Sequence, residues 1–180
     1  MEELKAEALH ECAAQFARID AVSLKNTEKV LTAYKEAFHF AGTSGYGYND
    51  PGREKLDEVF ARVFKAEKAL VRPHFVSGTH ALATVLCALL ETGDMLVSLV
   101  GAPYDTMQGV IGYARDSRNS LKKRGVLYRE VPLRDNTYDL QAIRKIVLKE
   151  RPRMVLLQRS RGYSTRPSLR IEDIREILAV

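Results

Sequence analysis

Residues 75–100 read FVSGTHALATVLCALLETGDMLVSLV, which places a turn, an apolar helix and a strand in immediate succession. The Ser-Gly-Thr turn leads into a helix that we predict from His80 to Leu90. Thr92-Gly93-Asp94 then ends the helix, and the apolar run from Met95 to Val100 predicts a strand. Such close succession of helix and strand is typical of α/β proteins.

The same alternation extends in both directions from this segment. Upstream, the apolar run Ala69 to Phe75 predicts another short strand, although Pro73 interrupts it. Downstream, the pattern predicts a helix over 106–115, a strand over 126–131, a helix capped by Asp139, a strand over 154–157 and a helix over 171–178. The fold class is therefore α/β, with part of a mainly parallel sheet and helices on both of its faces.

The N-terminal part has a different pattern. Apolar stripes over 4–16 and 30–38 predict two helices, or one long helix with a kink near residues 20–23. A loop with four glycines follows over 42–52, and Asp50-Pro51 predicts the cap and first residue of another helix. We predict a helical arm with a glycine-rich loop over 1–52 and the first part of an α/β domain over 53–180.

The composition of the 180 residues excludes several classes of protein. It is 46% hydrophobic and 28% charged, and no apolar run reaches the roughly 18 residues of a membrane span. The N-terminus has no secretory signal, and Cys12 and Cys87 form no C-x-x-C pair, so we expect a cytoplasmic protein without disulfides. The four histidines are scattered, so no metal site is predicted.

Charge is distributed unevenly along the chain. Residues 1–114 carry a net charge of −4 and residues 115–180 a net charge of +9. Such asymmetry suggests a module that binds nucleic acid or an acidic partner through residues 115–170. A basic surface that normally faces another part of the protein would leave the same signature. No DNA- or RNA-binding motif is recognisable, so nucleic-acid binding is kept only as the alternative.

Two predicted strand ends carry residues suited to a ligand. Ser77-Gly78-Thr79 begins a helix, where free backbone N–H groups and the helix dipole favour an anion. Tyr104 follows the next strand, where its ring could lie against a flat ligand. Each feature by itself also fits an ordinary turn or a rim aromatic. Together they indicate a planar, phosphorylated ligand.

Five short motifs in a fixed order carry a resemblance to a known family. They are YGYNDPG at 46–52, AEKALV at 66–71, SGTHAL at 77–82, TGD at 92–94 and YDT at 104–106. This set resembles the fold type I pyridoxal-phosphate enzymes, within them the cystathionine and methionine gamma-lyase group, and most of all its aluminium resistance branch. The resemblance implies a pyridoxal 5'-phosphate cofactor and an amino-acid substrate.

The same resemblance implies roles for particular residues. Gly78 and Thr79 would give backbone N–H groups to the cofactor phosphate, with Ser77 supporting the turn, and Tyr104 would stack on the pyridine ring. Tyr46 and Tyr48, from the glycine-rich arm, would reach a neighbouring subunit's site, which implies a homodimer or homotetramer.

Two segments depart from the pattern of the group. The arm usually reads Tyr-x-Arg, but here Tyr48 replaces the arginine, and Arg53 is the nearest substitute. The usual Glu-Thr-Pro-x-Asn-Pro loop is replaced by QRSRGY at 158–163. Arginines in and after this loop could bind a substrate carboxylate, but we favour a solvated basic loop; they are Arg159, Arg161 and Arg166.

The resemblance implies β- or γ-elimination from a sulfur amino acid, with the cofactor as electron acceptor. Family members have about twice this length, so the chain is expected to be an N-terminal portion that is inactive by itself. The Schiff-base lysine is expected beyond Val180, because no lysine here follows a strand in a loop of small residues. We therefore assign no catalytic residue.

Overall fold

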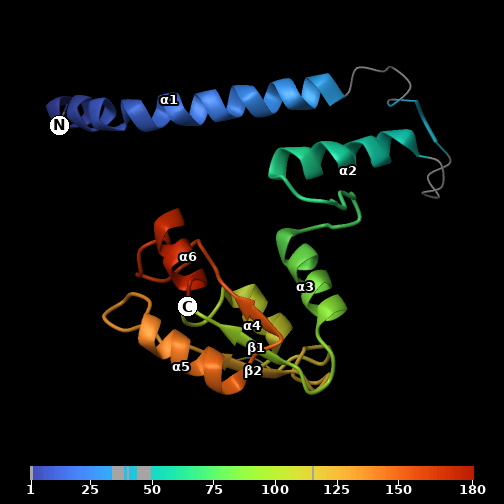
Figure 1. The fold of residues 1–180 in the computed structure, drawn as a ribbon, viewed down its shortest axis with the longest axis vertical. Helices are drawn as coiled ribbons and strands as arrows, with labels where there is room; N and C mark the ends of the chain where they lie inside the picture. Colours follow the sequence, from blue (N-terminus) through green and yellow to red (C-terminus); the bar gives the residue numbers. More distant parts are fainter. Residues whose placement is uncertain (1, 34–38, 40, 44–49, 115) are drawn as a thin grey trace. The chain divides into compact units, whose positions relative to one another are not determined.

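The computed structural model describes residues 2–33, 39, 41–43, 50–114 and 116–180 (Figure 1). Within these ranges the chain forms six helices and a three-stranded sheet. It divides into two compact units, Met1–His74 and Phe75–Val180. The domain boundary that we placed between residues 52 and 53 stays a prediction.

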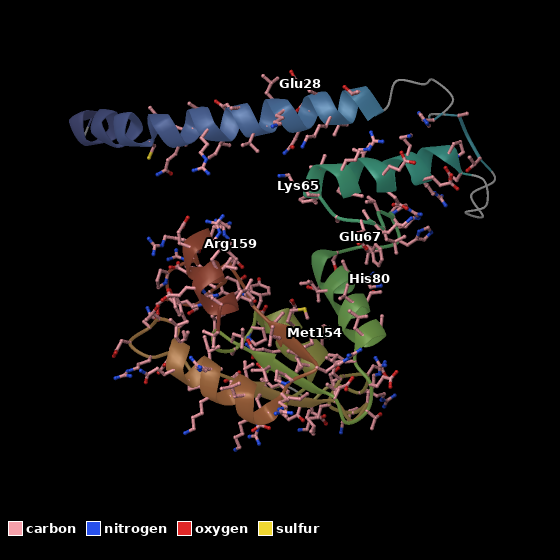
Figure 2. All side chains as sticks on the ribbon, in the orientation of Figure 1. Glu28, Lys65, Glu67, His80, Met154 and Arg159 are labelled. Carbon is pink, nitrogen blue, oxygen red and sulfur yellow. The ribbon has the colours of Figure 1, made fainter. Side chains whose placement is uncertain are left out.

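The second unit is built on a parallel sheet. Its strands are β1 (Met95–Ser98), β2 (Leu127–Glu130) and β3 (Met154–Leu156), in the order β2-β1-β3. Both pairings are parallel, and Val97 of the central strand lies opposite Arg129 on one side and Val155 on the other. Figure 2 labels Met154 at the start of β3. The predicted parallel sheet is confirmed, although each strand is shorter than its apolar run.

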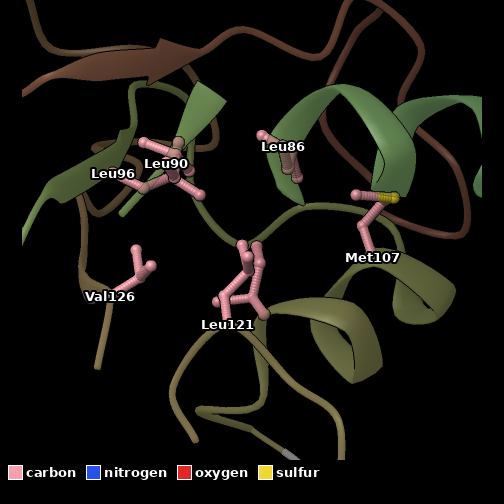
Figure 3. Close-up of a cluster of buried hydrophobic side chains, with 7 residues drawn as sticks. Leu86, Leu90, Leu96, Met107, Leu121 and Val126 are labelled. Atoms are coloured by element: carbon pink, nitrogen blue, oxygen red, sulfur yellow. The ribbon is translucent and has the colours of Figure 1, made fainter. Parts of the chain in front are cut away.

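Helices cover both faces of this sheet. Leu96 and Val97 are fully buried neighbours on β1, so their side chains point to opposite faces. The cluster around Leu96 includes residues of α3 (Gly78–Leu89) and α4 (Asp105–Ile111); its labelled members in Figure 3 are Leu86, Leu90, Leu96, Met107, Leu121 and Val126. The cluster around Val97 includes Ile143 of α5 (Leu140–Glu150) and Ile177 of α6 (Ile171–Leu178). The prediction of helices on both faces is confirmed.

The first unit contains α1 (Glu2–Ala33) and α2 (Pro51–Phe64). Because α1 continues through residues 20–23, the interpretation as two separate helices is wrong, and the alternative of one long helix is confirmed as far as residue 33. The prediction over 34–38 lies outside the described residues. Asp50 caps α2 as predicted, since its carboxylate accepts from the N–H of Arg53 at 3.1 Å. No helix within the described ranges is long and apolar enough to cross a membrane.

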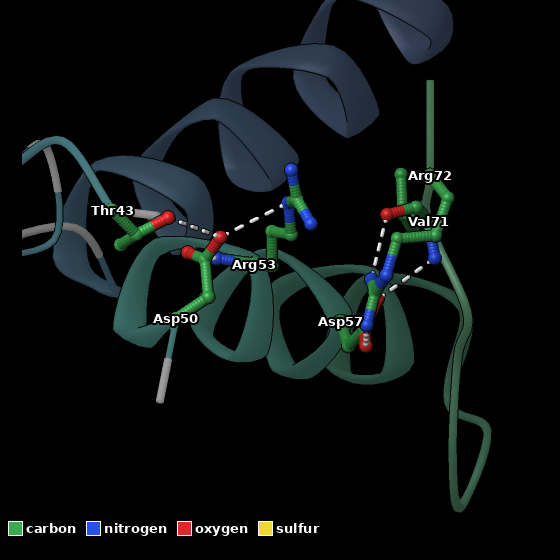
Figure 4. Close-up of polar contacts among 6 residues, drawn as sticks. All are labelled: Thr43, Asp50, Arg53, Asp57, Val71 and Arg72. Carbon is green, nitrogen blue, oxygen red and sulfur yellow. Dashed lines mark hydrogen bonds and ion pairs between the residues drawn. The ribbon is translucent and has the colours of Figure 1, made fainter. Parts of the chain in front are cut away.

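The carboxylate of Asp57 holds part of the segment after α2. The predicted strand over 69–75 is wrong, because these residues pair with no strand. Instead Asp57 of α2 accepts hydrogen bonds from the N–H of Val71 at 2.7 Å and from the Arg72 guanidinium at 2.7 and 2.9 Å (Figure 4). Partial burial opposes ionisation of Asp57, but these hydrogen bonds outweigh it and lower its pKa.

Candidate functional site

The N-terminus of α3 is capped by one side chain and otherwise open. The hydroxyl of Ser77 accepts from the N–H of His80 at 3.1 Å, which satisfies one of the free donors of the first turn. Among the described residues, no acceptor contacts the N–H groups of Gly78 and Thr79. A Cβ added to Gly78 would meet nothing within 4 Å, so the space beside the Cα of Gly78 is open. This end of α3 can therefore receive an anion.

A pair of hydroxyl groups joins the starts of α3 and α4. The Oγ1 atoms of Thr79 and Thr106 lie 2.9 Å apart, although the residues are 27 positions apart in the chain. The N–H of Thr106 donates to the carboxylate of the preceding Asp105 at 2.7 Å, so that carboxylate already has a partner. Thr106 thus adds a second hydroxyl to the donors at the start of α3.

Tyr104 lies two residues before Thr106 and has close contacts with the loop after β3. Its N–H donates to Oε1 of Gln158 at 2.7 Å, and its ring stacks on Tyr163 with centroids 5.6 Å apart and planes at 29°. A hydrogen bond with Tyr163 is the main cause that raises the pKa of Tyr104. The Thr79–Thr106 pair therefore links the predicted phosphate-binding turn to the predicted ring-stacking residue.

The structure gives different outcomes for the other predicted site residues. Tyr46 and Tyr48 lie outside the described residues, so their roles stay predictions. The structure adds three residues that sequence reasoning missed, namely Thr106, Gln158 and Tyr163. Gln158 could have been found, because it lies two residues after the end of β3, and the carboxyl ends of parallel strands share one edge of the sheet. Within the described ranges, no group of three His, Cys, Asp or Glu residues could hold a metal ion.

A cavity of about 350 Å³ lies between the start of α4 and the loop after β3. It is lined by residues that include Pro103, Tyr104, Gln158, Arg161, Tyr163 and Arg166. The favoured interpretation of a solvated basic loop holds for the exposed Arg159 and Arg161 but is wrong for Arg166, which is only 5% exposed. Burial lowers the pKa of Arg166, whose guanidinium donates to three backbone carbonyl groups, those of Gln158, Ser160 and Pro167.

Comparison with known proteins gives a match over the whole chain. Residues 1–180 match the methionine gamma-lyase family. A Listeria monocytogenes protein, proposed to be a cystathionine beta-lyase involved in aluminium resistance, is 38% identical with a TM-score of 0.86 over 99% of this chain and 46% of its own. A carbon-sulfur lyase involved in aluminium resistance from Clostridium novyi is 41% identical with a TM-score of 0.83 over 98% of this chain and 43% of its own.

A curated relative and a more distant structure agree with these matches. The uncharacterized protein YnbB of Bacillus subtilis is 36% identical over 89% of this chain and 39% of its own length. The pyridoxal-5'-phosphate dependent protein YhfS of Escherichia coli is 21% identical with a TM-score of 0.60, covering 88% of this chain and 40% of its own, and shows the fold alone. This chain spans less than half the length of each of these proteins. The predicted fold and family resemblance are confirmed, and the nucleic-acid alternative receives no support.

Proposed function

The chain belongs to the methionine gamma-lyase family, and from that premise we propose that it holds the cofactor phosphate in a pyridoxal-phosphate-dependent carbon–sulfur lyase. The substrate we propose is a sulfur amino acid, from which a β- or γ-substituent leaves. Cystathionine is the first candidate, because the Listeria monocytogenes relative is proposed to act on it, and methionine is the second.

The observation that carries the proposal is the hydroxyl pair at the open end of α3. Thr79 and Thr106 place two hydroxyl groups 2.9 Å apart beside N–H groups that have no acceptor among the described residues. A phosphate needs several donors and a space free of side chains, and the open space beside the Cα of Gly78 supports this requirement. The residues present therefore fit the phosphate of the cofactor.

Each residue has a separate task in this proposal. The N–H groups of Gly78 and Thr79 bind the phosphate, and the α3 dipole favours its negative charge. The hydroxyls of Thr79 and Thr106 would help to hold the phosphate as further donors. Tyr104 lies against the cofactor ring. When bound, the cofactor supplies an electron sink for bond breaking at the Cα of the substrate.

We further propose that the Schiff-base lysine belongs to the length that the relatives have and this chain does not span. The two lysines in the turn before β2 are directed to other partners. Lys122 lies over the ring of Tyr113 at 5.0 Å, and Lys123 pairs with Asp116 at 3.3 Å.

We also propose a homodimer or homotetramer in which the arm with Tyr46 and Tyr48 reaches a neighbouring site. We further propose a cytoplasmic location, which suits two free cysteines.

Thr79→Val tests the phosphate site directly. Hydrogen bonds to charged groups contribute about 1.5–3 kcal/mol, so the affinity for pyridoxal phosphate should fall about 10- to 100-fold. Equilibrium dialysis or absorbance titration measures this change. Thr84→Val is the matched control, because the Thr84 hydroxyl donates to the carbonyl of His80 further along α3 at 2.8 Å. Equal affinities in the two variants, or no binding by the unaltered chain, would contradict the proposal.

Borohydride reduction tests the proposed place of the lysine. Incubation of the 180-residue chain with pyridoxal phosphate and borohydride should give no single stoichiometric adduct, and the chain should release no keto acid from cystathionine or methionine. Mass spectrometry of the reduced chain and a keto-acid assay measure the two outcomes. One stoichiometric adduct at a single lysine, together with turnover, would place the catalytic lysine within these residues.

A further inference from the structure

The side chain of Gln158 accepts a hydrogen bond from the backbone at the start of α4. Tyr104 is the N-cap residue of α4, and its side chain makes no capping hydrogen bond. In a capping box the third helical residue would accept from the N-cap N–H, but here that residue is Met107, which has no suitable acceptor. Gln158 supplies the acceptor from 54 positions away, because its Oε1 lies 2.7 Å from the N–H of Tyr104.

The loop that carries Gln158 also contacts the ring of Tyr104. Tyr163 stacks on this ring, although its own side chain is 86% exposed. The backbone of Gly162 lies so close that an added Cβ would be 2.8 Å from Cδ2 of Tyr104. Gly162 also has a φ of +58°, a conformation that other residues rarely adopt. The loop therefore holds Tyr104 through its backbone and its ring together.

The position of Gln158 is itself held by the loop. Its Nε2 donates to the carbonyl of Ser160 at 2.9 Å, so both ends of the carboxamide are bonded. The buried guanidinium of Arg166 donates to that same carbonyl at 2.7 Å and to the carbonyl of Gln158 at 2.9 Å. A side chain bonded at both ends on a braced backbone has little freedom to turn away from Tyr104.

We propose that Gln158 is a positioning residue for Tyr104, whose ring forms one wall of the cofactor site. The loop 158–166 supports this ring in a preformed position. The effect of Gln158 on ligand binding rests on the proposed function, because Gln158 acts only through Tyr104. Tyr163 covers one face of the Tyr104 ring, so a planar ligand stacks on the opposite face. Loss of the Gln158 contact frees the ring and weakens stacking, while the phosphate donors of α3 stay in place.

Gln158→Leu in the full 180-residue chain tests this inference, with Gln141→Leu on the exposed surface of α5 as the matched control. Tyrosine-ring NMR should show shifted signals for Tyr104 and Tyr163 in Gln158→Leu and unchanged signals in Gln141→Leu. Affinity for pyridoxal phosphate should fall about 3- to 10-fold, the range of one neutral hydrogen bond, while affinity for inorganic phosphate stays the same. Gln158→Glu keeps an acceptor for Tyr104 and should restore most of the tyrosine signal.

The outcomes separate this inference from the proposed function. Unchanged signals of Tyr104 and Tyr163 in Gln158→Leu would overturn the positioning role, whatever the cofactor does. Shifted tyrosine signals in a chain that binds no pyridoxal phosphate would support the positioning role and contradict the proposed function. Shifted tyrosine signals with unchanged affinity for pyridoxal phosphate would overturn the proposal that the Tyr104 ring stacks on the cofactor. If Gln158→Leu does not fold, Gln158→Ala gives the same readout, because it removes the same acceptor from the N–H of Tyr104.

Discussion

The two units of the chain are stabilised in different ways. In the second unit, the central strand β1 is buried between two hydrophobic clusters, one on each face of the sheet. In the first unit, α1 leaves large apolar side chains exposed, among them Phe16 at 51%, Ile19 at 61% and Leu24 at 63%. In the same unit, the carboxylate of Asp57 binds the backbone N–H of Val71, fourteen residues away. Apolar burial therefore dominates in one unit, and polar anchors are prominent in the other.

Truncation of an apolar side chain should therefore have very different effects in the two units. Leu96→Ala removes a fully buried side chain from β1 and should lower the free energy of unfolding by about 2–5 kcal/mol. Leu24→Ala removes the same atoms from the exposed surface of α1 and should change it by less than about 0.5 kcal/mol. Urea denaturation followed by circular dichroism measures both. Similar losses in the two variants would show that α1 buries Leu24 in solution.

Removal of the Asp57 carboxylate should weaken protection against hydrogen exchange only in the first unit. Asp57→Ala leaves the N–H of Val71 without its acceptor and removes the carboxylate that pairs with the guanidinium of Arg72. Hydrogen bonds to a charged group contribute about 1.5–3 kcal/mol, so exchange of the Val71 amide proton should accelerate about 10-fold or more. Hydrogen exchange measured by NMR tests this, with the amide of Val97 as internal control. Equal acceleration at Val97 would mean that the two units unfold together.

The sequence predicts features that depend on contacts between residues close together in the chain, and it misses features that depend on distant residues. Asp50 and Asp139 were correctly predicted as caps, because each carboxylate accepts from an N–H only three residues ahead, at 3.1 and 3.0 Å. The strand predicted over 69–75 failed because its apolar pattern gives no sign that Val71 bonds to a side chain fourteen residues earlier. Local patterns predict elements, whereas contacts of long range require the folded chain.

The candidate site divides in the same way. Ser77, Gly78 and Thr79 could be predicted, because a helix start is a local feature, and Tyr104 followed from its place after a strand. The contacts of Thr106 with Thr79 and of Gln158 with Tyr104 could not, because they span 27 and 54 positions of the chain. Burial of Arg166 was equally hidden, since its acceptors are backbone carbonyl groups that have no residue type to recognise.

The anchors of the two units should also respond to opposite extremes of pH. Hydrogen bonds lower the pKa of Asp57, so its stabilisation is present above its unfolded pKa of about 3.9 and is lost as the pH falls through the lower folded value. In the second unit, Tyr138 donates to Glu176 at 2.8 Å, and this bond, with burial and the charge of Asp173, raises the pKa of Tyr138 to about 12. A raised pKa favours the protonated form, so this contribution is complete below pH 10.0 and is lost as the pH rises through about 12.

Titration of the two contacts therefore tests whether the units are anchored independently. Protection of the Val71 amide proton should fall in acid, while absorbance of the Tyr138 phenolate should appear only in strong alkali. Tyr138→Phe removes the donor to Glu176 and should remove the contribution of Tyr138 to the alkaline transition with little effect on the acid one, because Asp57 and Tyr138 share no partner. If Tyr138→Phe also shifted the acid loss of Val71 protection, the two anchors would be coupled and the contrast between the units would not hold.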